Sequence, residues 1–561
     1  MKFSEIQYKR PGLDTISKEL DTLAQKAESA PDGEALLKCF DAYRKISDSY
    51  STGRDIAYIR HSVDTRDEFY DGENDYFDEQ GPVIADKCLK FYRSVLASAY
   101  KDALATKYGE ILLKKIELAV KSSDERLISL QQQENNLISQ YEKLYAAAKI
   151  PFDGKEYTVA QLGLFKQNPD RDIRKRAIHA EGEFFDSNRN ALDQLYDQLV
   201  KNRSRQAKLL GFDSFTPLGD IRMERLGYGR PEITACREYV ARDIVPLVYK
   251  LKKAQAKRLG LPALKYYDDV LSFPDGNPVP HGTPEEILSA GQAMYRELSP
   301  ETAEFIDFMM ENELFDVLAK PGKAPGGYCT QIADYKAPFI FSNFNGTSGD
   351  VDVLTHEAGH AFAAYRALRK ELPPELANPG MESCEIHSMS MEFLTAPYHH
   401  LFFKEDTEKY SFSHTEDALY FLPYGCQVDE FQEKVYENPE MSPEERNELW
   451  LKLEKKYRPW NDFDALPFYS RGAGWQRQMH IYTSPFYYID YVLAQSVALQ
   501  FFISSRHDSE QAWKQYLTLL EKAGTGTYPQ LVEAAGMGLP YKDGVLREVG
   551  TRIFGYLQEE M

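Results

Sequence analysis

The chain has 561 residues, of which 43% are hydrophobic, 27% charged and 13% aromatic. This composition provides enough apolar side chains for a large core, and it excludes a disordered or collagen-like chain. The 67 basic and 87 acidic residues give a net charge of −20, so the average field repels phosphate backbones and anionic membrane surfaces. We therefore expect a globular protein with no nucleic-acid partner and no membrane partner.

The opening sequence and the cysteines suggest where the protein acts. The stretch MKFSEIQYKRPGLD lacks the apolar centre of a secretion signal, and the chain has no uncharged apolar run of about 18 residues. Six cysteines are spread along the chain without a C-x-x-C pair, a pattern typical of reduced structural thiols. These features predict a cytoplasmic protein.

Most of the chain is predicted to be helical. Ile16, Leu20 and Leu23 recur at helical spacing, and a longer apolar stripe runs from Leu127 to Ala148. Thr283 and Ser442 each precede a proline and lie three residues before a glutamate, the pattern of a capping box at a helix start. The sequence thus indicates a mainly α fold.

Extended structure is predicted in two places. Residues 150–159 contain an Asp-Gly pair between short apolar runs, which is typical of a hairpin. Residues 337–344 form an apolar run with a proline at its second position, which favours an edge strand. Between the helical segments, residues 272–282 hold several prolines and glycines and are expected to form a loop.

One short segment carries the pattern of a metal site. His356 and His360 lie one turn apart on a predicted helix, so both imidazoles can reach one zinc ion. Glu357 points about 100° away around the helix and can accept a proton from a water molecule beside the metal. Gly359 leaves room for a neighbouring backbone. This H-E-x-x-H pattern predicts a zinc site with Glu357 as its base.

A catalytic zinc needs a third protein ligand. Spacing alone leaves four candidates on the next predicted helix, and the acids among them that are not ligands would be partners of the imidazole N–H groups or plain surface acids. The candidates are Glu382, Glu385, His387 and Glu392. We favour a structural role for His387, because two histidines and a glutamate usually suffice.

The pattern H-E-x-G-H, followed 25 residues later by the glutamate of E-x-x-S-x-x-x-E, resembles the thimet oligopeptidase family of zinc peptidases, and in particular its oligoendopeptidase F branch. The resemblance implies that Glu385 is the third ligand and Glu392 its companion acid. Many relatives carry E-x-P-S-Q-x-x-E, whereas this chain has His387 and Met389 in place of the proline and glutamine. That departure leaves His387 without an assigned role.

Three further segments carry the resemblance. Residues 325–329 and 338–346 resemble the strand and loop before the zinc helix that hold the substrate main chain. Residues 471–491 resemble the family's histidine and tyrosine segment, which implies that His480 and Tyr491, with Tyr488 next, stabilise the oxyanion. The spacing after His480 needs a gap relative to the wider family. Tyr482 and Tyr487 therefore remain open as alternatives.

The resemblance also implies the architecture and the activity. We expect a two-lobed, zincin-like helical body with a deep central channel and a small β-sheet beside the zinc helix. Residues 1–200 would form a helical N-terminal lobe, and residues 201–561 the catalytic region that closes the channel. The expected activity is zinc-dependent endopeptidase cleavage of short unstructured oligopeptides, with one zinc ion per chain. A zinc exopeptidase and a non-catalytic, zinc-stabilised peptide-binding protein are the alternatives.

Overall fold

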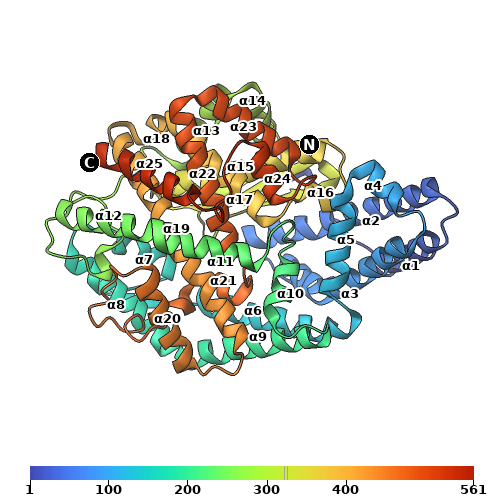
Figure 1. Ribbon diagram of the computed structural model, residues 1–561, viewed down its shortest axis with the longest axis horizontal. Helices are drawn as coiled ribbons and strands as arrows, with labels where there is room; N and C mark the ends of the chain where they lie inside the picture. Colours follow the sequence, from blue (N-terminus) through green and yellow to red (C-terminus); the bar gives the residue numbers. More distant parts are fainter. Residues whose placement is uncertain (321, 325, 561) are drawn as a thin grey trace.

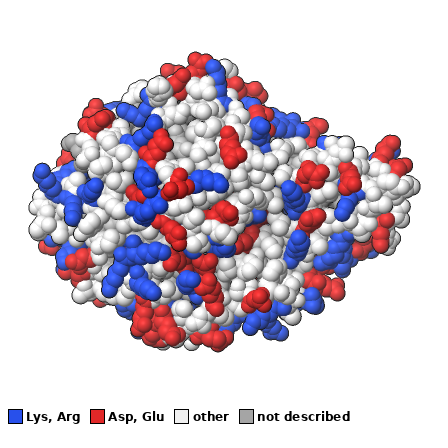
Figure 2. All heavy atoms as spheres, viewed as in Figure 1, with Lys and Arg blue, Asp and Glu red and all other residues white. Residues whose placement is uncertain are grey.

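Helices dominate the computed structural model, which describes residues 1–320, 322–324 and 326–560 (Figure 1). The mainly α fold class predicted from the sequence is confirmed. Within the described residues, none of the helices is long and apolar enough to cross a membrane. Acidic and basic side chains are interspersed over the face shown in Figure 2.

The N-terminal helices form a lobe that projects from the body at the right of Figure 1. They are α1 (Leu13–Glu28), α2 (Gly33–Val63), α3 (Glu68–Ala97), α4 (Asp102–Tyr108) and α5 (Glu110–Ser122). Their apolar faces meet in a core of their own, to which Leu20 and Leu23 of the predicted α1 stripe contribute. From the rest of the chain, Leu376 is the buried residue that joins this core.

The following helices pack into the main core of the molecule. They are α6 (Ile128–Ala146), α7 (Val159–Lys166), α8 (Arg171–Ser187), α9 (Arg189–Leu209), α10 (Phe215–Arg222), α11 (Arg230–Tyr239), α12 (Val245–Arg258), α13 (Pro284–Leu298) and α14 (Pro300–Glu311). The predicted hairpin is present as β1 (Ile150–Phe152) and β2 (Lys155–Tyr157). The predicted division at residue 200 lies inside α9 and stays a prediction.

A three-stranded sheet precedes the helix that carries the H-E-x-x-H motif. It contains β3 (Phe315–Leu318), β4 (Tyr328–Ile332) and β5 (Ala337–Phe344), in the order β3-β5-β4. The expectation that residues 337–344 form an edge strand is wrong, because β5 is central and the edge strands are β3 and β4.

Pro338 is tolerated in this central strand because of where β3 begins. The Ile340 N–H donates to the carbonyl oxygen of Leu314, just before β3. Backbone N–H groups alternate in direction along a strand, so the nitrogen of Pro338, two residues earlier, also points toward the β3 side. Pairing with β3 starts only at Ile340. The missing N–H of Pro338 therefore faces no strand.

The remaining helices, from residue 349 onward, complete the C-terminal part of the molecule. They are α15 (Gly349–Arg369), α16 (Pro374–Ala377), α17 (Met381–Leu394), α18 (His400–Phe403), α19 (Thr407–Glu437), α20 (Pro443–Tyr457), α21 (Met479–Thr483), α22 (Tyr488–His507), α23 (Ser509–Lys522), α24 (Tyr528–Ala534) and α25 (Val545–Glu559). The capping boxes predicted at Thr283 and Ser442 start α13 and α20.

Candidate active site

The two helices with the candidate metal ligands, α15 and α17, pack against each other at Gly359. A side chain at this position would place its Cβ 2.6 Å from the Ser388 Cα and 2.7 Å from the His387 carbonyl oxygen. Only glycine fits such an approach between backbones. The close packing expected from the sequence at Gly359 is confirmed, and it brings the His356 face of α15 onto the Glu385 face of α17.

His356, His360 and Glu385 converge on one point. The Glu385 Oε2 atom lies 3.3 Å from the Nε2 of His356 and 3.5 Å from the Nε2 of His360, and the three donor atoms lie within 4.8 Å of one another. A tetrahedral zinc with bonds of about 2.0–2.1 Å separates its ligand atoms by about 3.3–3.4 Å. These donors therefore fit a zinc ion in type and in spacing.

A carboxylate behind this group orients one of the imidazoles. Glu392 accepts a hydrogen bond from the Nδ1 of His356 at 2.7 Å, which leaves the Nε2 lone pair facing Glu385. Burial works to raise the pKa of Glu392, but the hydrogen bonds from His356 and His414 hold it at about 2. The companion acid implied by the resemblance is thus in contact with a candidate ligand.

Glu357 lies beside this group in a cavity of about 380 Å³, called the small cavity below. The small cavity is lined by His356, Glu357, His360, Glu385, Tyr487 and Tyr491, together with residues of β4, α16, α17 and α23. Glu357 is 8% exposed, and burial raises the pKa of its carboxyl group. A carboxylate in this position can take a proton from a water molecule held next to the three donors.

The tyrosine segment supplies two phenols to the small cavity. Tyr491 lines it, and the Tyr487 hydroxyl donates to Oε1 of Glu385. Tyr488 lies outside the lining, against Phe421 and Tyr424. Tyr482 is buried in the core, where its ring stacks on Tyr141 at 4.0 Å.

Sequence reasoning ranked Tyr487 below Tyr491 and Tyr488. The spacing of four residues between Tyr487 and Tyr491 places both on one helix face. That spacing was the sequence feature that could have ranked Tyr487 beside Tyr491. The same reasoning gave no role to His414, because nothing in a single sequence connects it with Glu392, 22 residues away.

His480 stands next to these phenols. Its ring centroid is 5.8 Å from those of Tyr487 and Tyr491. The Tyr424 hydroxyl donates to the Gln478 oxygen, and the Gln478 amide then donates to Nδ1 of His480. Because Nδ1 accepts this hydrogen bond, the neutral His480 ring carries its proton on Nε2. Burial lowers the pKa of His480. A neutral imidazole with a free Nε2–H can donate a hydrogen bond.

The other candidates on α17 have different surroundings. Glu382 is 2% exposed and lies near Asp490 and Arg225. The expectation that it would be an imidazole partner or a surface acid is therefore wrong. Burial, with the nearby Asp490 carboxylate, raises its pKa. His387 lines the small cavity but lies outside the group of converging donors. The two residues therefore do not belong to the set that fits a metal.

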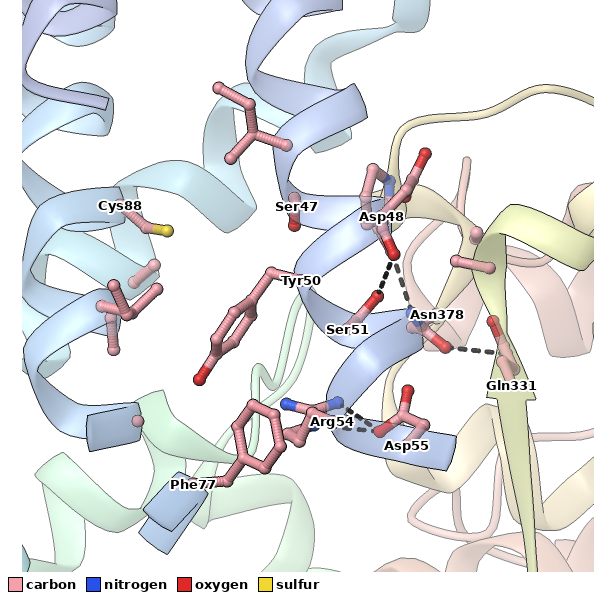
Figure 3. A pocket seen from close by; sticks show the side chains of 18 of the residues that line it. Ser47, Asp48, Tyr50, Ser51, Arg54, Asp55, Phe77, Cys88, Gln331 and Asn378 are labelled. Atoms are coloured by element: carbon pink, nitrogen blue, oxygen red, sulfur yellow. Dashed lines mark hydrogen bonds and ion pairs between the residues drawn. The ribbon is translucent and has the colours of Figure 1, made fainter. Parts of the chain in front are cut away.

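A cavity of about 1130 Å³, called the large cavity below, adjoins the small one. The two share Cys329 and Gln331 of β4 and Ala377 and Asn378 beyond it. Figure 3 shows α2 along the large cavity, with Asp48, Tyr50 and Arg54 on it and Gln331 opposite. The exposed edge of β4 thus runs from the candidate metal site into space walled by the N-terminal lobe. Pro325, in the predicted segment before β4, lies outside the described residues.

Comparisons with known proteins identify the family of the chain. The family model described as "Peptidase M3 N-terminal domain" matches residues 3–123, and the model described as "Peptidase family M3" matches residues 302–551. A solved Pz peptidase A with an inhibitor is 47% identical, with a TM-score of 0.97, over 100% of this chain and 99% of its own. The chain belongs to peptidase family M3.

Curated family members are more distant. An oligoendopeptidase F homolog of Borreliella burgdorferi is 24% identical over 71% of this chain and 69% of its own length. An oligoendopeptidase F of Lactococcus lactis subsp. cremoris is 23% identical over 71% of this chain and 66% of its own. Together with the family, these similarities support a peptide-bond hydrolase of the metallo-oligopeptidase type, rather than a non-catalytic peptide-binding protein.

Proposed function

We propose that the protein is a zinc-dependent endopeptidase that hydrolyses internal bonds of short unstructured oligopeptides. The observation that carries the proposal is the convergence of His356, His360 and Glu385 at the spacing of a tetrahedral zinc site, with Glu357 beside them in the small cavity. When bound, one zinc ion per chain would act as a Lewis acid toward the scissile carbonyl and would lower the pKa of water.

The side chains of this protein would then transfer the proton, stabilise the oxyanion and position these groups. Glu357 takes a proton from the attacking water and passes it to the leaving amine. Tyr491 and the Nε2–H of His480 donate hydrogen bonds to the oxyanion, and Tyr487, bonded to Glu385, holds that carboxylate in place. Tyr488 packs beside His480, 5.1 Å between ring centroids, and positions it.

The shape of the interior supports oligopeptides as substrates. The large cavity exceeds the roughly 300–1,000 Å³ of pockets for drug-sized ligands. The edge strand β4 can add an extended peptide through backbone hydrogen bonds, which read its sequence only weakly. Because the large cavity adjoins the small one along β4, a substrate can extend from the candidate metal site into the space walled by the N-terminal lobe. The oligoendopeptidase names of the similar proteins favour an endopeptidase over an exopeptidase.

Location and partners complete the proposal. We place the protein in the cytoplasm, which its free cysteines support. Its partners are the oligopeptide substrates themselves.

Peptides blocked at both ends test the cleavage mode. A mixture of random peptides, half of them acetylated and amidated, is digested, and the products are identified by mass spectrometry. We expect cuts at internal bonds in blocked and free peptides alike, and resistance of a stable folded protein. If only peptides with a free terminus are cut, the exopeptidase alternative replaces the proposal.

A further inference from the structure

The carboxylate of Glu392 joins two imidazoles from different helices. One oxygen accepts from Nδ1 of His356 on α15 at 2.7 Å, and the other accepts from Nε2 of His414 on α19 at 2.7 Å. The His414 side chain is 11% exposed. The candidate metal ligand His356 is thus connected, through one acid, to a helix that contributes no ligand.

A second contact joins the same two helices one turn earlier. The hydroxyl of Tyr410, four residues before His414, donates to Asp352, four residues before His356. The Tyr410 ring stacks on Phe403 at 3.8 Å and lies 5.5 Å from His414, while Phe393 packs 4.9 Å from His414. These aromatic neighbours fix the plane of the His414 imidazole.

The chemistry of these groups determines what His414 can do. An ionised carboxylate only accepts hydrogen bonds, so both imidazoles must donate to Glu392. His356 therefore carries its proton on Nδ1 and keeps the lone pair on Nε2, the atom that faces Glu385. Without His414, one oxygen of the half-buried Glu392 carboxylate loses its partner, and the carboxylate can rotate about its last bond away from His356.

We propose that His414 is a positioning residue of the metal centre, which holds Glu392 in the orientation that fixes the ring and tautomer of His356. This inference rests on the proposed zinc site. Loss of the direct outer partner of a metal-ligating histidine typically weakens metal affinity by about 10–100-fold, and loss of His414, one contact further out, should have an effect at the lower end of that range. His414 does not touch the substrate in this account and acts only through Glu392.

Zinc affinity of the full-length protein, measured by competition with a chromophoric chelator, tests the inference. His414→Phe keeps an aromatic ring among Phe393 and Tyr410 but donates no hydrogen bond, and we expect it to bind zinc about 10-fold more weakly than the parent. His414→Gln retains an N–H at nearly the position of Nε2 and should restore affinity close to that of the parent. Rescue by glutamine separates the hydrogen bond from the packing.

His399→Phe is the matched control. His399 belongs to the same buried aromatic cluster, 6.2 Å from His414 between ring centroids. It contacts the backbone of Glu392 rather than its carboxylate, so its replacement should leave zinc affinity unchanged. Parental affinity in His414→Phe, or an equal loss in His399→Phe, would overturn the inference. If His414→Phe does not fold, His414→Asn, whose shorter amide cannot reach Glu392, takes its place under the same criteria. A parent protein that binds no zinc would instead refute the proposed function.

Discussion

The centre of the catalytic half and the N-terminal lobe are built in opposite ways. In the centre, Gly359 lets α15 and α17 approach until backbone atoms touch, and a small cavity of about 380 Å³ holds converging polar groups. The lobe has a separate core and walls a large cavity of about 1130 Å³. Tight packing fixes the geometry of reacting groups, whereas a separately packed lobe can admit substrates of varied sequence.

This contrast predicts different kinetic effects for substitutions in the two regions. Substitutions in the centre should lower kcat, because they remove interactions made in the transition state. Substitutions on the lobe wall should change KM for particular peptides, because they affect how the substrate is held. A lobe variant that lowers kcat for all peptides, or a central variant that alters only KM, would break the comparison.

The largest effect is expected for Glu357→Gln. The amide keeps the shape of the buried side chain but cannot accept a proton, so kcat should fall by about 10²–10⁴. Zinc content, measured by atomic absorption, should stay near that of the parent. Loss of zinc from this variant would assign Glu357 a structural role instead.

The phenols of the centre should come next. Tyr491→Phe removes one hydroxyl from the small cavity and should lower kcat by about 10²–10³ with little change in KM. Tyr482→Phe is the matched control, since that tyrosine is stacked in the core and should retain nearly normal kcat.

Tyr487→Phe sharpens the assignment, because its hydroxyl bonds a candidate ligand. We expect weaker zinc binding in this variant in addition to a lower kcat. If Tyr491→Phe keeps normal activity and Tyr488→Phe does not, the oxyanion donor in this segment is Tyr488.

The smallest effect should come from the lobe. In the large cavity, Arg54, Arg222 and Lys336 are each paired with a carboxylate. Among the described residues, none forms an ion pair with the Asp48 carboxylate on α2, although Arg44 of the same cavity acts on it from farther away. A solvent-accessible charge pair contributes up to about 1 kcal/mol, so Asp48→Asn should raise KM for lysine- or arginine-containing peptides by about 2- to 5-fold. Peptides without basic residues serve as the control and should be cut as before.

The sequence predicted the fold class and the central motif for identifiable reasons. His356, Glu357 and His360 lie within five residues of one helix, so local periodicity alone places them together. The hairpin at Asp153 and Gly154 was equally local, because both residues adopt positive φ in the turn.

Features that depend on distant contacts were not predictable in this way. The central place of β5 depends on β3, some twenty residues earlier in the chain, and Pro338 was a misleading signal because its nitrogen faces past the end of that strand. The bond from His414 to Glu392 and the large cavity itself arise only when separate helices pack. Tyr487 falls between these cases, since its helical spacing from Tyr491 was visible but its contact with Glu385 was not.

Metal removal and return tests the central claim most directly. The protein is treated with a chelator, dialysed, and assayed on an internally quenched peptide blocked at both ends, before and after addition of increasing zinc. We predict no activity in the metal-free protein and full recovery at one zinc per chain. Undiminished cleavage of the blocked peptide by protein shown to be metal-free would contradict the account.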